Sequence, residues 1–253
     1  MPLCRCRSLW SLWSLLALAL SLKAVPVWAE EPTFCGEKPT SHAQSLSVGR
    51  SSEGKLLGAK ALESSEAIRT LPRRHVRRCL NWGTPRLVDA LRRAAEAVRQ
   101  SSPDSPPLGV GDLSKAQGGP IPPYSRSHQS GRDADLAFYQ LDEKGQPVPA
   151  EDLLSFDARG SADNGKRRFD THRNWLLVRA LLEDPEVDVQ WMFISVPLRQ
   201  ALLEEARKRK EPAPLIQRAE RVLHQPTDSR PHDDHFHVRI RCTPEERTAG
   251  CVG

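Results

Sequence analysis

The chain has 253 residues, 38% of them hydrophobic and 27% charged, with 21 prolines and a formal net charge of +5. This length allows one domain with a substantial core, or at most two small ones, and the proline content disfavours a fold of long helices. The first 29 residues carry three of the positive charges and no acid, so the surplus of +2 in the remaining chain argues against nucleic-acid binding.

Those first 29 residues have the features of a secretory signal peptide. A basic start precedes an apolar run over residues 9–22 that only serines interrupt, and Val27 and Ala29 form a small-residue cleavage site. The run is shorter than the ~20 apolar residues of a membrane-spanning helix, which disfavours the alternative of a membrane anchor. We therefore expect cleavage after Ala29, no membrane association afterwards, and a mature domain over residues 30–253.

Export would place the chain in an oxidising compartment, where cysteines can pair. Two of the six cysteines would leave with the signal, and four remain: Cys35, Cys79, Cys242 and Cys251. Four cysteines allow three pairings. Cys242 and Cys251 bracket a short polar segment and can close a small loop, in which case Cys35 pairs with Cys79; the alternative is that some stay free.

The first part of the mature chain predicts a hairpin and then a helix. Glycines punctuate residues 45–61, which we interpret as a short hairpin. Thr84 is a suitable N-cap and Pro85 suits the first helical position. Apolar residues then recur at helical spacing, so we predict an amphipathic helix over residues 85–100.

The rest of the chain predicts strands alternating with helices. We expect strands over residues 108–112, 133–139, 188–196 and 235–241. We expect helices over residues 173–182, 198–210 and 213–223. We expect loops over residues 114–124, 141–165 and 225–234. Together these elements predict an α+β fold, with a small, mostly antiparallel sheet flanked by helices in a single domain.

Two short segments hold four of the eight histidines, and their spacing suggests a metal site. In one segment, six residues separate His128 from Asp135. The other segment runs from His232 to His237. A catalytic zinc takes three nitrogen or oxygen ligands and keeps a fourth position for water. A lone His-x-His pair is common without a metal, but its combination with an upstream His and Asp in an exported chain favours metal binding.

The last predicted strand would present its histidines together. Alternate strand residues point to the same side, so His235 and His237 share a face with Arg239 and Arg241, while Phe236 and its alternating apolar neighbours face the core. By the same rule Asp133 and Asp135 share a face of their own strand. Asp133 could then orient a ligand imidazole or be a solvated acid.

At this point the sequence resembles a known family. The segments SHQSGRDADL and HDDHFHVRIRC resemble the two signature segments of the penicillin-insensitive murein endopeptidases, zinc peptidases related to the lysostaphin-type enzymes and the D-alanyl-D-alanine metallopeptidases. SLSVGRSSEGKLLGAKAL, RRCLNWGTPRLVDALRRAAEAV and LGVGDLS resemble further parts of the same family. The similarity therefore extends over about residues 43–242.

The resemblance implies a role for each residue of the two segments. His128, Asp135 and His237 match the ligands of Zn²⁺, the implied cofactor. His235 matches the histidine that acts as base, and His232 matches a further active-site histidine. The implied substrate is the D-alanyl–meso-diaminopimelyl cross-link of peptidoglycan, and the implied compartment is the periplasm.

Some alternatives remain open. Ser125 stands where some relatives have a histidine that can hold a second metal ion, which argues against a second site. Arg239 and Arg241 could meet an anionic stem peptide or be surface charges. The protein could instead be a zinc D,D-carboxypeptidase or dipeptidase, or a wall-binding or zinc-storage protein without catalysis; His235 and His232 favour catalysis over storage. The oligomeric state is not indicated by the sequence.

Overall fold

The described part of the protein is a computed structural model of residue 1, residues 33–72 and residues 77–253. The segment predicted to be a signal peptide falls almost wholly outside the described residues. From Thr33 onward, the described residues belong to one compact unit. None of the described helices has the length and apolar character needed to cross a membrane.

A six-stranded sheet forms the centre of the fold. Its strands, in spatial order, are β13 (Leu223–His224), β12 (Val189–Phe193), β14 (His235–Ile240), β7 (Asp133–Ala137), β6 (Leu108–Val110) and β4 (Ile68–Thr70). The two outermost pairs, β13 with β12 and β4 with β6, are parallel, and the three inner pairs are antiparallel. The expected α+β fold with a mostly antiparallel sheet is confirmed.

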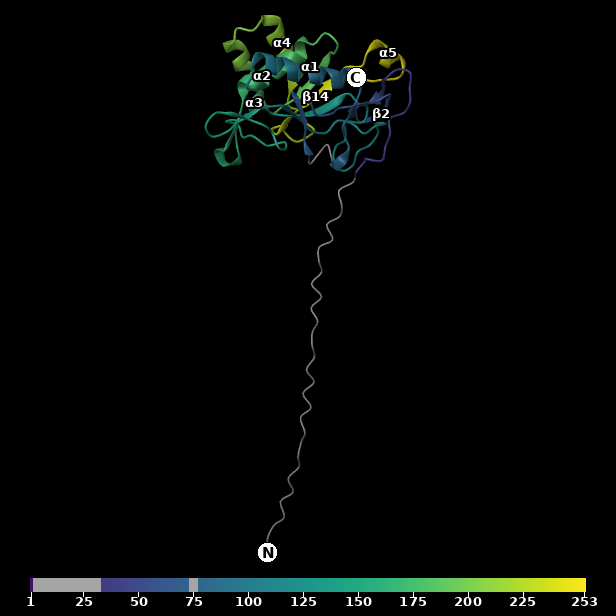
Figure 1. The fold of residues 1–253 in the computed structure, drawn as a ribbon, viewed down its shortest axis with the longest axis horizontal. Coiled ribbons are helices and arrows are strands. Elements are labelled where there is room, and N and C mark those ends of the chain that lie inside the picture. Colours follow the sequence, from purple (N-terminus) through teal and green to yellow (C-terminus); the bar gives the residue numbers. More distant parts are fainter. Residues whose placement is uncertain (2–32, 73–76) are drawn as a thin grey trace. The chain divides into compact units, whose positions relative to one another are not determined.

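Helices flank this sheet, and Figure 1 shows α1, α2 and α4 along one side of β14. The helices are α1 (Pro85–Ser101), α2 (Thr171–Glu183), α3 (Val196–Lys208), α4 (Ala213–Val222) and the short α5 (Pro244–Thr248). The first begins as predicted, because the hydroxyl of Thr84 accepts a hydrogen bond from the Leu87 amide and Pro85 occupies the first turn.

The core lies between the helices and one face of the sheet. The inward residues of β14 are fully buried in the same apolar cluster as the inner faces of α1 to α4: Phe236, Val238 and Ile240. Burying one such side chain contributes about 1.5–3 kcal/mol. This packing decides which face of β14 points away from the core, and that outer face carries the alternating residues His235, His237 and Arg239.

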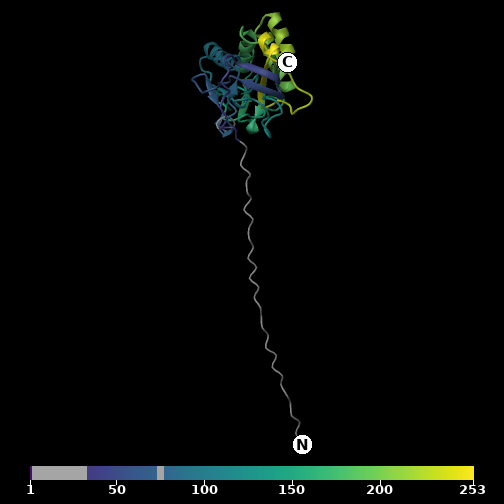
Figure 2. The same cartoon turned by 90° about the vertical axis from the view of Figure 1, so that its right-hand side faces the viewer.

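The N-terminal hairpin and the C-terminus lie side by side, which Figure 2 shows as purple strands next to the yellow end of the chain. The hairpin consists of β1 (Leu46–Arg50) and β2 (Glu53–Leu57). The amide of Val252 donates to the carbonyl of Gly49 at 2.9 Å. Two disulfides, Cys35–Cys79 and Cys242–Cys251, confirm the pairing in which the last two cysteines close a small loop.

The prediction of a loop over residues 141–165 is wrong. This segment contributes to a second, four-stranded sheet in the order β10 (Ser161–Ala162), β11 (Arg167–Phe169), β8 (Gln140–Leu141) and β9 (Pro147–Val148), and it also holds a 3-10 helix, η2, at Asp163–Gly165. Strands of two or three residues are too short to show an alternating pattern. The same reason explains why the short strands β5 (Trp82–Gly83), β4 and β13 are not expected from the sequence. The predicted hairpin extends too far, because β3 (Lys60–Ala61) pairs with β5.

Candidate metal centre

His128 reaches the site from a loop that enters β7. Its backbone has a φ of 63°, in the left-handed region that costs a non-glycine residue about 1–2 kcal/mol. The neighbouring backbone fixes the loop: the Gln129 amide donates to Ser51 and the Thr84 amide donates to Gly131, at 3.0 and 2.9 Å. The imidazole of His128 is 1% exposed. The loop therefore places this side chain inside the protein.

The register of two central strands brings the other candidate ligands together. β14 pairs antiparallel with β7, so that His237 lies opposite Asp135 and Arg239 lies opposite Asp133. The three residues predicted to bind a metal, His128, Asp135 and His237, are all buried and close enough to hold one ion. Segments about 100 residues apart in the sequence thus meet because of strand pairing.

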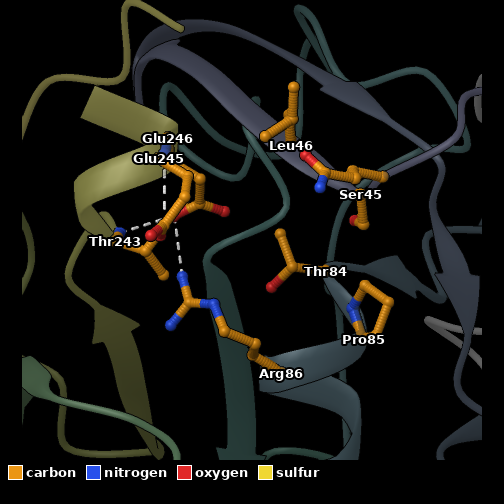
Figure 3. A pocket seen from close by; sticks show the side chains of 9 residues that line it. Ser45, Leu46, Thr84, Pro85, Arg86, Thr243, Glu245 and Glu246 are labelled. Carbon is orange, nitrogen blue, oxygen red and sulfur yellow. Dashed lines mark hydrogen bonds and ion pairs between the residues drawn. The ribbon is translucent and has the colours of Figure 1, made fainter. Parts of the chain in front are cut away.

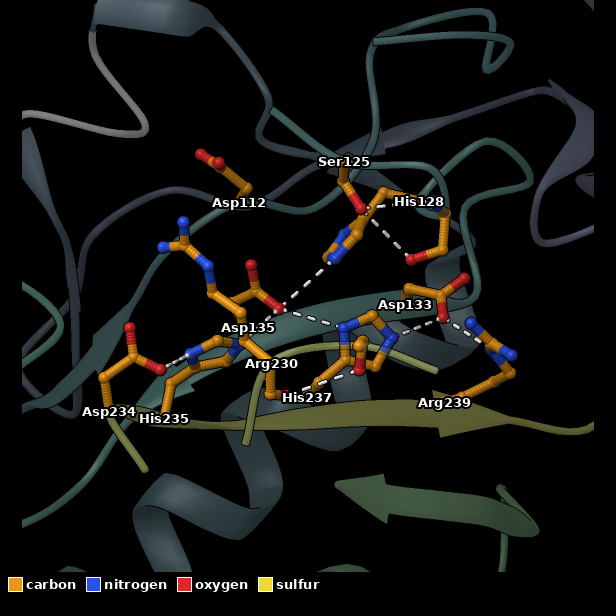
Figure 4. Close-up of polar contacts among 12 residues, drawn as sticks. Asp112, Ser125, His128, Asp133, Asp135, Arg230, Asp234, His235, His237 and Arg239 are labelled. Atoms are coloured by element: carbon orange, nitrogen blue, oxygen red, sulfur yellow. Dashed lines mark hydrogen bonds and ion pairs between the residues drawn. The ribbon is translucent and has the colours of Figure 1, made fainter. Parts of the chain in front are cut away.

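The ligand atoms converge on one carboxylate oxygen, as Figure 4 shows. Oδ1 of Asp135 lies 3.2 Å from Nε2 of His128 and 3.2 Å from Nδ1 of His237. Neither contact has hydrogen-bond geometry, and this buried oxygen has no hydrogen-bond partner among the described residues. Ligand atoms bound at ~2.0–2.1 Å to a tetrahedral zinc lie about 3.3 Å apart. The donor set and its spacing therefore fit a zinc ion.

A second group of histidines adjoins the first and shares His237 with it: His232, His235 and His237. It contains no carboxylate, and His232 and His235 are only partly buried. Ser125 belongs to neither group among the described residues; its hydroxyl accepts a hydrogen bond from the Ser127 amide at 3.1 Å. The buried group with the carboxylate is the better cation site, because it supplies charge and excludes water.

The acids of the site are held ionised. Burial raises the pKa of Asp135, but His128 and His235 outweigh it and hold that pKa well below its usual range. Burial likewise raises the pKa of Asp133, but Arg239 and His237 more than compensate, so its pKa is also lowered. For His128 the balance is opposite in sign: burial lowers its pKa, but the carboxylates around it produce a net rise.

His235 lies beside the carboxylate but is oriented by a different acid. Its Nε2 lies 3.3 Å from Oδ1 of Asp135, and its Nδ1 donates to Oδ1 of Asp234 at 2.5 Å. Burial alone lowers the pKa of His235, but Asp135 and Asp234 raise it to about 10. Sequence reasoning missed Asp234; its place directly before His235 was the available signal.

His232 differs electrostatically from its neighbour. Its ring centroid lies 5.0 Å from that of His235 and 5.7 Å from that of His237. Burial, with further repulsion from these two imidazoles, lowers the pKa of His232 to about 4. It is therefore neutral at physiological pH and can donate one hydrogen bond without carrying a charge.

The sequence around the candidate centre matches a known family. Residues 47–252, which include both segments, match the family described as penicillin-insensitive murein endopeptidase. The chain belongs to this family. A relative from Haemophilus influenzae described as a penicillin-insensitive murein endopeptidase is 26% identical over 215 residues, covering 81% of this chain and 66% of the relative. The chain thus spans slightly less than two thirds of that relative's length.

In this murein endopeptidase family member, a groove of about 450 Å³ opens beside the candidate metal ligands. Its lining is rich in serine and also holds two arginines, one aromatic ring and two histidines: Ser51, Ser52, Ser125, Arg126, Ser127, Phe193, Pro226, Asp228, Ser229, His232, His237 and Arg239. Arg126 links two of the lining segments, because its guanidinium donates a hydrogen bond to the Asp228 carbonyl at 3.0 Å. The groove gives an extended polar ligand access to the site.

A smaller pocket of about 270 Å³ lies between α1 and α5 (Figure 3). Its buried acid, Glu246, accepts hydrogen bonds from Arg86 and from the Thr243 amide, and its other oxygen accepts one from the Ser47 amide. These partners satisfy the Glu246 carboxylate, so this acid stabilises the packing of α5 against α1 and the N-terminal hairpin.

Proposed function

We propose that this protein is a zinc endopeptidase that hydrolyses the D-alanyl–meso-diaminopimelyl cross-links of peptidoglycan. The observation that carries the proposal is the meeting of His128 and His237 at one buried oxygen of Asp135, with spacing that suits zinc. Membership of a family described as murein endopeptidases supports the substrate class.

His128, Asp135 and His237 would hold the ion through Nε2, Oδ1 and Nδ1 respectively. Zn²⁺ supplies a Lewis acid that polarises the scissile carbonyl and lowers the pKa of a water molecule toward about 7. Asp133 accepts a hydrogen bond from Nε2 of His237 at 2.8 Å and so keeps Nδ1 free of a proton.

His235 is the proposed base. Asp234 holds its Nδ1–H, so its Nε2 is the nitrogen that faces the reacting groups. A cation at Asp135 would offset the larger of the two charges that raise the pKa of His235, so this pKa would fall and the imidazole would lose its proton more readily. It then takes a proton from the attacking water and passes it to the leaving amine. His232, which is neutral, donates a hydrogen bond to the developing oxyanion.

The proposed compartment is the periplasm, reached with a signal peptide that is cleaved after Ala29. The two disulfides support an oxidising environment. N-terminal sequencing of protein recovered from a periplasmic extract tests this: a mature chain that begins at Glu30 is expected, and an uncleaved chain in the cytoplasm would contradict the proposal.

The metal assignment is tested with His128→Ala and His237→Ala, and with His42→Ala, an exposed histidine outside the site, as the matched control. Bound zinc is measured by elemental analysis of purified protein, and cleavage by digestion of cross-linked murein. We expect both site variants to lose zinc and cleavage while the control keeps both. Full zinc and full cleavage in His237→Ala would refute the assignment.

Analysis of the products distinguishes the related activities. Cleavage of a muropeptide dimer into two monomers supports the endopeptidase, whereas release of D-alanine from a monomer would identify a D,D-carboxypeptidase or dipeptidase. Binding to murein without any new product would identify a protein that binds the wall without catalysis.

A further inference from the structure

Arg239 lies on the inner wall of the groove, directly beside the metal centre. It follows His237 by two residues on β14 and faces the same side of the sheet. Its Nε donates to Oδ1 of Asp133 at 2.6 Å, the oxygen that also accepts from Nε2 of His237. The guanidinium carbon lies 5.8 Å from the centre of the Phe193 ring.

Most of the donor capacity of Arg239 is unused. A guanidinium has five N–H donors, and among the described residues only Asp133 accepts a hydrogen bond from this one, through Nε. The side chain is 17% exposed, and the acid that holds it has no exposed surface. The two terminal nitrogens therefore form a fork of fixed orientation at the wall of the groove, a geometry suited to a carboxylate.

The second arginine of this segment has a different environment. Arg241 lies beyond the end of β14, is 43% exposed on its side chain and pairs with Asp188, away from the groove. Within the groove, Asp228 is the one acid among the described lining residues. Of the two arginines that line it, Arg239 already pairs with the buried Asp133 but keeps its terminal N–H groups for an anionic ligand, and it lies on the strand that carries His237.

We propose that Arg239 binds the free carboxylate of the amino acid on the amine side of the scissile bond; this inference rests on the proposed function. In the cross-link, the scissile nitrogen is attached to a carbon that also bears a free carboxylate. Only the nitrogen and that carbon separate the carboxylate from the reacting carbonyl. A group that recognises this carboxylate must lie next to the metal centre, as Arg239 does.

The test uses two muropeptide dimers, one with the free carboxylate at that carbon and one with a carboxamide. The wild type is expected to cleave the carboxylate dimer with a kcat/KM about 10- to 100-fold higher, the range for one charge-assisted contact. In Arg239→Gln, kcat/KM for the carboxylate dimer should fall by a similar factor, and the kcat/KM values for the two dimers should differ by less than about threefold. Arg241→Gln, the matched control, should behave as the wild type does.

Two outcomes overturn the inference. One is equal cleavage of both dimers by the wild type, which decides the matter even where Arg239→Gln fails to fold. The other is an equal loss of kcat/KM on both dimers in Arg239→Gln, which would assign Arg239 a structural role through Asp133. Zinc content is measured in each variant, and Arg239→Lys, which keeps the charge without the fork, should discriminate to an intermediate degree.

Failure of the proposed function has a different signature. It would appear as a wild type that cleaves neither dimer. Binding of the two dimers to the zinc-loaded wild type, measured by titration calorimetry, then decides the subsite by itself. Tighter binding of the carboxylate dimer supports the role of Arg239, and equal affinity overturns it.

Discussion

His237 donates a hydrogen bond of 2.8 Å from Nε2 to Oδ1 of Asp133, a carboxylate with no exposed surface. The bond leaves Nδ1 as the nitrogen that faces Asp135, 3.2 Å away. A carboxylate in this position sets the tautomer and the ring orientation of a metal-binding histidine and makes it a stronger ligand. Asp133 is therefore placed to orient His237 at the candidate metal centre, and it is not one of the three candidate ligands.

Asp133→Asn should weaken zinc binding about 10- to 100-fold, because the amide has no charge to support the imidazole of His237. A competition titration with a chromophoric chelator measures the dissociation constant. Asp163→Asn is the matched control, since Asp163 is exposed and its left-handed backbone also suits asparagine. An affinity within twofold of the wild type in Asp133→Asn would contradict this role.

His235→Ala should keep its zinc and lose hydrolysis, with kcat about 10²- to 10⁴-fold lower, because the base is removed while the ligands remain. Elemental analysis and murein digestion on the same sample give both quantities. His172→Ala, at a half-buried position on α2 outside the site, serves as the control. Loss of zinc in His235→Ala would make this residue a ligand and refute the division of roles.

Gly131→Ala should destabilise the loop that carries His128. Gly131 has a φ of 72°, and a Cβ there would lie 2.6 Å from a methyl group of the fully buried Leu56, so that one of the two must shift. Gly165→Ala has a similar φ of 88° but open space around the added carbon. We expect about 1 kcal/mol of destabilisation in Gly165→Ala and at least 1–3 kcal/mol more in Gly131→Ala.

Urea denaturation measures the free energy of unfolding of both glycine variants. A zinc titration on the same proteins then shows whether the Gly131 change also moves His128. Equal losses of stability in the two variants would mean that backbone conformation alone, without the contact to Leu56, explains the cost.

Zinc affinity should fall as the pH decreases. The pKa of His128 is raised in the ion-free protein, so a proton occupies the imidazole at a higher pH than usual and must leave before Nε2 can bind a metal. The apparent dissociation constant should rise by up to about tenfold per pH unit for each displaced proton. Calorimetry in two buffers of different ionisation enthalpy measures proton release, and binding without any release would contradict this expectation.

Much of the site follows from periodicity. The alternation in β14 predicts that His235 and His237 share a face opposite Phe236, because side chains of a strand alternate and apolar ones are buried. The helix from Pro85 is likewise predictable, since its cap and its apolar spacing are local signals. The strands between residues 140 and 165 are not predictable, because strands of two residues depend on pairing partners rather than on pattern.

Residue type and local spacing were enough to predict the family and the α+β class, and to single out the residues that are candidates to bind a metal. How those residues meet depends on tertiary contacts: the register of β14 on β7 places His237 opposite Asp135, and the hydrogen bond from the Gln129 amide to the Ser51 carbonyl holds the loop that carries His128. The tertiary structure also separated Arg239, which faces the groove, from Arg241, which pairs with Asp188. Strand register and loop packing depend on contacts between residues far apart in the chain, and local sequence patterns do not predict such contacts.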